Sequence, residues 1–533
     1  MFNLLERAAD LIEQDFKKGT ICKNRQKPME KQNREEKKKK SVLILELLEK
    51  NNITLFHDQY NTAWARIRLA DHYEVVPVNS KLMRDYANRL LWLNEKETAS
   101  SETIKSALAV LEAKARFESS CHHLYYRVAW HNGALWIDLG DKTWRAVKVT
   151  AEGWEIVPSG EVPILFRCYS HMAPLPLPED GPGIEGLREL LPLGDEDAWD
   201  LVRVWLVTAF LPDIPRPGII LHGLQGAGKS TVAEILRQIV DPSQTPLNTL
   251  PKDHENLVQI LAHHFLPTFD NLRSLPSWAS DDLCIAVTGG GFSKRQLYTN
   301  EDDIIFKFCR PFILTGISIP GTSPDLLDRS IILHIDRIPK EARQPKKQIF
   351  EQFEAIRASI FKQILDSMVY CLRKVEETAE KLKDLPRMAD WLIWSYTAAE
   401  ALGIGGEKFK RAYERNVNHQ HDEVIEADPV GKAVWTFMNE RAEGRWEGTA
   451  SELYEAVKEI AKRDGLDQDK QWPKAVNAFT RRLRSLVYNF EEKGLRFEEH
   501  RTGRKRSITL FLEVGEKHRH YRHSTIRVGS TPW

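Results

Sequence analysis

The chain has 533 residues, which is enough for three or four domains that each bury a core of their own. Lys plus Arg and Asp plus Glu number 76 each, so the formal net charge is +0 and the overall charge predicts no partner. Any surface that binds nucleic acid must therefore be local. The six cysteines are scattered without a CxxC pair, so neither a disulfide framework nor a zinc site is indicated.

Two stretches bear on the cellular compartment. The longest apolar run, residues 204–211, is too short to span a bilayer and is followed by Pro212. Residues 1–16 have helical apolar spacing but early charges, unlike a secretory signal. We therefore expect a cytoplasmic protein with no membrane partner.

The N-terminal third of the sequence consists of a basic arm and an α+β pattern. Residues 17–40 are polar and basic with few large apolar side chains, so residues 1–44 are predicted to be a flexible arm. The next predicted domain, residues 45–185, has a helix-like segment at 80–118. Its role stays open. Short aromatic and β-branched runs then alternate with turn pairs at Asn132-Gly133, Gly140-Asp141 and Glu152-Gly153.

A glycine-rich loop follows an apolar run that is typical of a buried strand. Residues 223–230 read GLQGAGKS and satisfy the pattern GxxxxGK[ST], and a helical run comes directly after them. In such a loop the backbone N–H groups surround phosphates, the lysine reaches the β- and γ-phosphates, and the hydroxyl ligates Mg²⁺. The sequence therefore predicts a site for ATP or a close relative, with Mg²⁺. The predicted binding residues are Gly223, Gly226, Gly228, Lys229, Ser230 and Thr231.

Two adjacent residues downstream are candidates for the hydrolytic machinery. Asp270 ends an apolar run and is predicted to hold Mg²⁺ through water, together with Ser230. Asn271 occupies the place where hydrolysing ATPases often carry a glutamate that orients the attacking water. Asp281 and Asp282 are weaker candidates for the base, and slow turnover is the alternative.

A predicted β-hairpin lies directly before a third candidate. Residues 288–317 contain a glycine turn, a strand, a polar turn and two more strands, of which the last ends at Thr315. The Thr315 hydroxyl is expected to contact the γ-phosphate or a water. Arg329 follows a short acidic helix and precedes a strand, and from there an arginine can reach the γ-phosphate of a neighbouring subunit. Arg310 competes for that role, and a structural ion pair is the alternative for Arg329.

The order of the motifs FDN, TGGGF, LYT and DLxDRS makes residues 195–420 resemble a known family. It is similar to the superfamily 3-like, or D5-like, helicase-type ATPases of the AAA+ class, which phages, plasmids and integrated elements encode. The resemblance implies a hexameric ring whose hairpin lines a central channel and grips single-stranded DNA. It implies that Lys294 and Arg295 contact that strand, and that Arg329 acts on the nucleotide of the adjoining subunit.

A predicted lid helix adds to this resemblance, whereas three features differ from the usual pattern of the family. Residues 385–394 are similar to a lid helix of that family, and Arg387 within them either approaches the nucleotide or pairs with Asp390. Thr315 stands where an asparagine is usual, and the hairpin tip is acidic. Together with Asn271, the acidic tip favours a protein that binds DNA without unwinding it.

The C-terminal residues 428–515 show the order helix, short strand, helix, helix and hairpin, which is typical of a winged helix. Thr449 or Ser451 is expected to cap the second helix, and Pro473 to lie early in the third. Basic residues gather in the third helix and the hairpin, which favours duplex DNA over a protein partner. The predicted DNA-contacting residues are Arg481, Arg482, Arg484, Arg504, Lys505 and Arg506.

These patterns predict a multidomain α/β protein that binds ATP, Mg²⁺ and DNA. The expected function is that of an ATP-dependent DNA helicase, translocase or replication initiator of a mobile genetic element. An ATP-gated DNA-binding switch or loader is the alternative, and a small-molecule kinase explains the phosphate loop alone. The predicted parts are an arm (1–44), an α+β domain (45–185), an AAA+ P-loop core (186–340), a helical lid (341–427), a winged helix (428–515) and a disordered tail (516–533).

Overall fold

The computed structural model describes residues 40–295, 303–316, 323–383, 385–469, 471–502 and 505–513. The greater part of the predicted arm and the whole predicted tail lie outside these residues, as does the tip of the predicted hairpin. The chain forms two compact units, one ending at Leu124 and the other beginning at Tyr125, and both belong to the mixed α/β class. Within the described residues, each helix is too short or too polar to cross a membrane.

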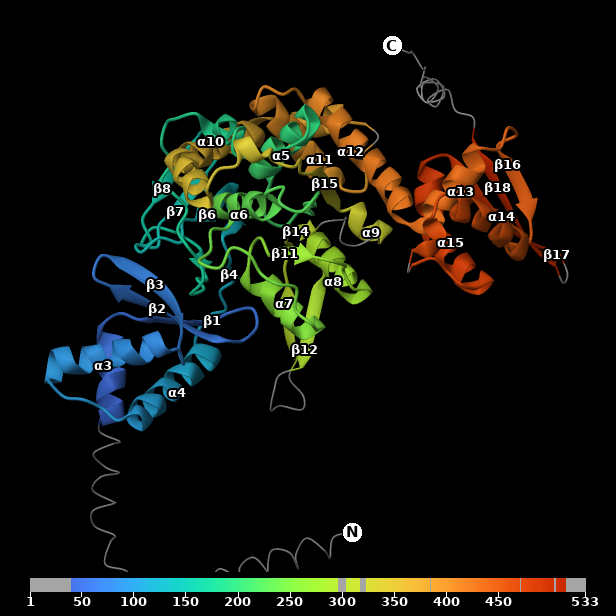
Figure 1. Ribbon diagram of the computed structural model, residues 1–533. Coiled ribbons are helices and arrows are strands. Elements are labelled where there is room, and N and C mark those ends of the chain that lie inside the picture. The colour runs from blue at the N-terminus through green and yellow to red at the C-terminus, as the bar shows by residue number, and fades with distance from the viewer. Residues whose placement is uncertain are drawn as a thin grey trace, which may run out of the picture. The chain divides into compact units, whose positions relative to one another are not determined.

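The first unit is a small antiparallel sheet with helices (Figure 1). The predicted helical segment 80–118 is two helices, because Lys96 adopts a left-handed conformation with φ of 55° and ends the first of them. Ser80 and Ser100 cap the two N-termini by accepting hydrogen bonds from backbone N–H groups. Its elements are β1 (Thr54–His57), β2 (Ala63–Leu69), β3 (His72–Pro77), α3 (Lys81–Glu95) and α4 (Ser101–Phe117).

The second unit begins with an antiparallel meander of four strands in the order β5-β6-β7-β8. Asn132 and Gly133 have φ of 50° and 74°, so the predicted turn between β5 and β6 is present. Residues of this meander share one hydrophobic core with the next sheet of the unit. The structure thus divides the predicted 45–185 domain at Leu124. The strands are β4 (Leu124–Tyr125), β5 (Val128–His131), β6 (Ala134–Asp138), β7 (Ala146–Val149), β8 (Trp154–Val157) and β9 (Leu165–Phe166).

A parallel sheet of order β11-β14-β10-β15 forms the centre of the second unit. Most residues of its strands are buried, as expected of a parallel sheet whose two faces are covered. A hairpin of β12 and β13 is present as predicted. The strands are β10 (Gly218–His222), β11 (Thr268–Leu272), β12 (Gly291–Arg295), β13 (Asp303–Lys307), β14 (Ile313–Gly316) and β15 (Ser330–His334). The helices are α5 (Glu196–Thr208), α6 (Lys229–Val240), α7 (His254–His263), α8 (Ser277–Thr288) and α9 (Pro324–Leu327).

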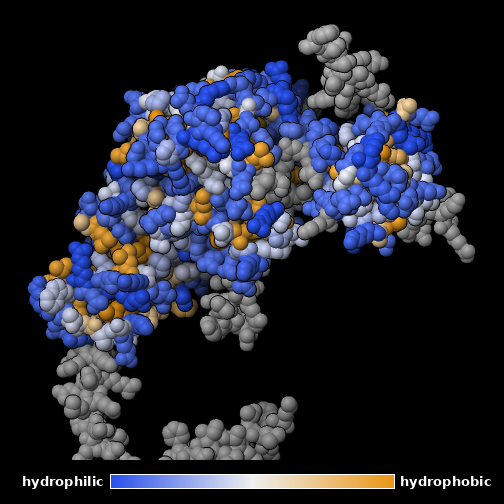
Figure 2. All heavy atoms as spheres, viewed as in Figure 1, coloured by the Kyte–Doolittle hydropathy of each residue, from blue (hydrophilic) through white to orange (hydrophobic). Residues whose placement is uncertain are grey.

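Three long helices follow the sheet: α10 (Lys346–Lys381), α11 (Ala389–Ala401) and α12 (Gly406–Ala427). The Trp391 indole of α11 donates to the Thr208 hydroxyl of α5 at 3.0 Å, and the Asn416 side chain of α12 bonds to both backbone groups of Ile332 in β15. These contacts bind α11 to α5 and α12 to the central sheet. The surface over α10 and α11 is mainly hydrophilic in Figure 2, as expected of helices that bury one face.

The C-terminal elements occur in the predicted order and form a three-stranded antiparallel sheet, β16-β18-β17, with three helices. Thr449 and Glu452 form a capping box at α14. The prediction for Pro473 was wrong, since α15 begins after it, at Val476. The elements are α13 (Pro429–Asn439), β16 (Arg445–Gly448), α14 (Ala450–Arg463), α15 (Val476–Glu492), β17 (Leu495–Thr502) and β18 (Lys505–Leu512).

Candidate active site

The glycine-rich loop connects β10 to α6 and has the backbone that its sequence requires. Gly223 has a φ of 143°, and a Cβ there would lie 2.4 Å from the carbonyl oxygen of Ile335, so only glycine fits. Gly228 has a φ of 87° and is the N-cap of α6. The helix therefore begins at Lys229 with its unpaired N–H groups at the loop, an arrangement that favours anions.

Lys229 lies inside the turn of this loop. Its ammonium donates hydrogen bonds to the carbonyl oxygens of Gly223 at 2.7 Å and Leu224 at 2.9 Å. Partial burial lowers the pKa of Lys229, while the nearby carboxylate of Asp270 acts in the opposite direction. The ammonium is thus held inside the loop by carbonyl groups, which are partners that a phosphate can replace.

Three of the predicted residues meet at the ends of neighbouring strands. β14 lies between β10 and β11, which brings Thr315 between the loop and Asp270. One oxygen of the Asp270 carboxylate accepts hydrogen bonds from the Ser230 hydroxyl at 2.9 Å and from the Thr315 hydroxyl at 2.5 Å. The Thr315 oxygen in turn accepts the backbone N–H of Asn271 at 2.9 Å. Thr315 therefore holds Asp270 and Asn271 in place in this structure.

A pocket of about 880 Å³ unites these groups. It brings the phosphate loop, the acidic strand end and the Thr315 strand end into one cavity. It also contains Arg273, which the sequence pattern does not single out. The lining residues are Gln225, Gly226, Ala227, Gly228, Lys229, Ser230, Thr231, Asp270, Asn271, Leu272, Arg273, Thr315 and Gly316.

The two weaker candidates for a catalytic base lie elsewhere. Asp281 and Asp282 are on α8 and do not line the pocket. Asp282 bonds to the His254 ring at 2.7 Å and is nearly buried, and this burial raises the pKa of its carboxyl. The structure therefore gives neither residue a place near the phosphate loop.

Arg329 also lies outside the pocket of its own chain. It directly precedes β15, and its guanidinium bonds to the backbone oxygen and the carboxylate of Asp325, both at 2.6 Å. Arg387 pairs with the same Asp325 at 2.8 Å and with Asp328 at 3.5 Å, so it joins Arg329 and does not approach the nucleotide loop. Arg310 is buried against the rings of Phe265 and Tyr126, which is a structural role.

Most of the C-terminal arginines whose side chains are described have acidic partners. Arg482 pairs with Asp428, and Arg484 bonds to Glu499 at 2.9 and 3.1 Å. Arg481 is exposed on α15. The side chains of Lys294, Arg295, Lys505 and Arg506, and the whole of Arg504, lie outside the described part of the structure.

A second cavity of about 380 Å³ lies where β10 and β15 meet α5 and α12. His222, the last residue of β10, reaches it directly before the phosphate loop, and its ring lies 4.9 Å from that of His334. Burial lowers the pKa of His222 to about 4, so its ring is neutral near pH 7. Asn416 and Arg415 of α12 and Asp195 before α5 line the other walls.

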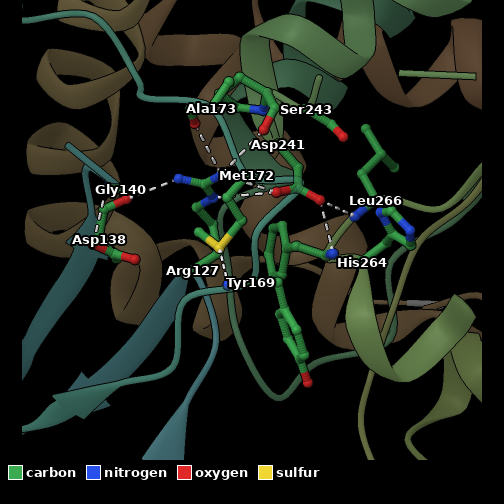
Figure 3. Close-up of polar contacts among 12 residues, drawn as sticks. Arg127, Asp138, Gly140, Tyr169, Met172, Ala173, Asp241, Ser243, His264 and Leu266 are labelled. Carbon is green, nitrogen blue, oxygen red and sulfur yellow. Dashed lines mark hydrogen bonds and ion pairs between the residues drawn. The ribbon is translucent and has the colours of Figure 1, made fainter. Parts of the chain in front are cut away.

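A buried ionic cluster ties the site to the meander (Figure 3). Asp241 follows α6 and accepts hydrogen bonds from the Arg127 guanidinium at 3.1 and 3.2 Å and from the backbone of Phe265 and Leu266, just before β11. The Arg237 guanidinium pairs at 3.0 Å with the Asp241 oxygen that accepts from Phe265 and Leu266, whereas Arg127 bonds to the other oxygen. Burial alone would raise the pKa of Asp241, but Arg237 and Arg127 hold it well below its usual range. One carboxylate thus links α6, β11 and the meander.

Together, the strands and helices define a multidomain protein of the mixed α/β class. Residues 184–419, which include the whole pocket, match the family model of the actinomycete integrative conjugative element replication protein. Residues 430–522 match the model of the C-terminal domain of this protein, AICE RepA. The two models follow each other in order and cover more than half of the chain, so the chain belongs to this family of replication proteins. The predicted kinship with replication proteins of integrated elements is confirmed.

The comparison with curated proteins gives no match. Two solved structures of the NrS-1 C-terminal region are similar to the chain at 12% identity. The first covers 88% of this chain and 98% of that chain with a TM-score of 0.40, and the second covers 89% and 99% with a TM-score of 0.39. A ligand-bound structure of JCV helicase is similar at 15% identity over 42% of this chain and 65% of that chain, with a TM-score of 0.23.

Proposed function

We propose that the chain is an ATP-dependent DNA helicase or translocase that acts in replication of its mobile element, and that it hydrolyses ATP between the subunits of a hexameric ring in the cytoplasm. The observation that carries the proposal is the convergence of Lys229, Ser230, Asp270 and Thr315 in one pocket that lacks Arg329 of the same chain. In this proposal α10, α11 and α12 form the lid of a P-loop AAA+ core.

The donor set of the pocket fits Mg²⁺ and ATP. The Ser230 hydroxyl and the Asp270 carboxylate offer hard oxygen donors, which Mg²⁺ prefers, and their oxygens lie 2.9 Å apart. Asp270 would hold Mg²⁺ through water. Lys229 and the N–H groups at the start of α6 would bind the phosphates, and Thr315 would keep Asp270 oriented. When bound, Mg²⁺ neutralises charge on the β- and γ-phosphates. The second cavity, behind His222, would hold the nucleoside.

Arg329 is proposed to complete the site of the adjoining subunit, because its short helix holds it outside the pocket of its own chain. Arg329→Ala and Lys229→Ala chains should each be inactive alone. Mixed rings should recover part of the ATPase rate, since some interfaces then combine an intact loop with an intact arginine. Phosphate release measured against the mixing ratio checks this, and a rate that stays at zero in demonstrably mixed rings contradicts it.

We propose that the C-terminal residues 428–513 are a winged helix that holds duplex DNA through α15. Arg481 and Arg484 are both exposed on this helix, but Arg484 is already paired with Glu499. We therefore expect Arg481→Ala to weaken DNA binding at all sequences and to lower the slope of log K against log salt by about 1. The matched variant Arg484→Ala should change the slope less, as fluorescence anisotropy titrations at several salt concentrations would show.

Asn271 favours a second candidate, an ATP-gated DNA-binding switch or loader. Among the described residues that line the pocket, Asp270 is the sole carboxylate, and it is committed to Ser230 and Thr315. A strand-displacement assay on a forked substrate separates the two functions. Unwinding that depends on Lys229 and Arg329 supports the motor, and ATP-dependent DNA affinity without unwinding supports the switch.

A further inference from the structure

One cation in the pocket has no part in the machinery described so far. Lys229 and Arg273 are the two positively charged residues among the described residues that line it. Lys229 belongs to the phosphate loop, whereas Arg273 lines the pocket from the segment directly after β11, three residues after Asp270. We propose that Arg273 is a catalytic residue that contacts the γ-phosphate of ATP bound by the same chain. This assignment rests on the proposed function.

The end of β11 turns Arg273 toward the pocket. Asn271 has a φ of 59°, in the left-handed region, and the pairing of β11 with β14 shifts register between Phe269 and Leu272. A bulge of this kind bends a strand and changes the side to which the following residues point. Here the Leu272 side chain is 8% exposed, and Arg273 after it is exposed at the pocket. The Asn271 backbone N–H is fixed by the Thr315 hydroxyl, so the bulge is anchored.

The Arg273 guanidinium is available for a ligand. Within the described part of the chain, no carboxylate pairs with it, while Asp270 is taken by two hydroxyl groups. The other candidate arginines are engaged elsewhere: Arg329 and Arg387 with Asp325, and Arg310 against aromatic rings. A guanidinium in the same pocket as a phosphate loop suits an oxyanion, because it offers paired donors in one plane.

The chemistry of hydrolysis gives such a cation a task. The oxygen of a water forms a bond to the γ-phosphorus, the bond from that phosphorus to the bridging oxygen breaks, and its electron pair stays on ADP. Both protons of the water end on the released phosphate, as H2PO4⁻. Negative charge spreads over the γ-phosphoryl oxygens during this exchange, and a guanidinium stabilises it. Asn271 orients water through its amide but takes no proton, so stabilisation of this charge carries more of the rate.

The first test separates transition-state stabilisation from binding. In Arg273→Ala we expect kcat to fall about 10²–10³-fold, while the Kd of a non-hydrolysable ATP analogue changes less than about threefold. The Kd of ADP with aluminium fluoride, which mimics the transition state, should rise with the loss in kcat. Arg273→Lys should recover part of kcat and part of the affinity for ADP with aluminium fluoride. Arg337→Ala, an exposed arginine outside the pocket, is the matched control and should resemble the wild type.

The second test asks in which chain Arg273 acts. Arg273→Ala chains mixed with Lys229→Ala chains should stay inactive, because no site then contains both residues. Rescue as large as that expected for Arg329→Ala would overturn the assignment, and so would an unchanged kcat or a loss confined to analogue binding. Wild-type protein that hydrolyses no ATP marks failure of the proposed function, whereas an active wild type with an unaffected Arg273→Ala overturns the Arg273 assignment alone.

Discussion

Replacing Lys229 with alanine is expected to lower kcat/KM for ATP by at least about 10²–10³-fold, the scale of losing one preorganised donor to a developing anion. The ammonium is held inside the loop turn by the carbonyl groups of Gly223 and Leu224. Arg273 is the other cation among the described residues that line the pocket, and because it belongs to the segment after β11 and not to the loop, we expect it not to replace the lost charge. Release of phosphate and the binding of a fluorescent ATP analogue measure the effect.

Lys252→Ala is the control for this experiment, because Lys252 is an exposed lysine outside the pocket. It should hydrolyse ATP at the wild-type rate. Unfolding midpoints should be equal in the two variants and the wild type, since the hydrogen bonds that the Lys229 ammonium makes in the described structure go to carbonyl groups of its own loop. Hydrolysis by Lys229→Ala within threefold of the wild type would show that the ATP site lies elsewhere in the chain.

The parts of this site that are contiguous in sequence could be predicted, and so could the meeting of distant strand ends. Residues 223–231 form one loop between a strand and a helix. Asp270 and Thr315 follow apolar runs, and the carboxyl ends of parallel strands share one edge of a sheet. Arg273 could not be predicted, because period-two alternation puts it on the face opposite Asp270. The register shift between Phe269 and Leu272 places Arg273 at the pocket instead, and no local sequence pattern predicts this shift.

The boundary between the two compact units, at Leu124, could not be predicted from the sequence for a similar reason. The turn pairs predict the meander correctly, but they do not indicate that the meander packs with the parallel sheet in one core. Its connection to α6 depends on Arg127 and Asp241, which are 114 positions apart. An isolated arginine between strands is expected to face solvent, and the burial of Arg127 with its partner Asp241 is fixed by tertiary packing alone. A boundary at residue 185 therefore looked natural, whereas the core continues from Tyr125.

The largest effect on stability is expected from Asp241→Ala. The carboxylate is 0% exposed, and its loss leaves the buried guanidinium groups of Arg127 and Arg237 without their anion and two backbone N–H groups without an acceptor. Breaking such a pair costs about 3–5 kcal/mol. The control is Glu499→Ala, which breaks the exposed pair with Arg484 and should cost about 1 kcal/mol or less. Urea unfolding curves at pH 7 measure both.

At acid pH, the free energies of unfolding of the wild type and of Asp241→Ala should become more similar. The pKa of Asp241 is lower in the folded chain than the value of about 3.9 for a free aspartate, so the unfolded chain takes up the proton first. The contribution of Asp241 is therefore complete above about pH 5 and is lost progressively as the pH falls below about 4. Because Asp241 also anchors the end of α6 and the entry of β11, the variant should lose ATP affinity in step with stability. A variant with wild-type unfolding at pH 7 would mean that this cluster does not hold the nucleotide site to the meander.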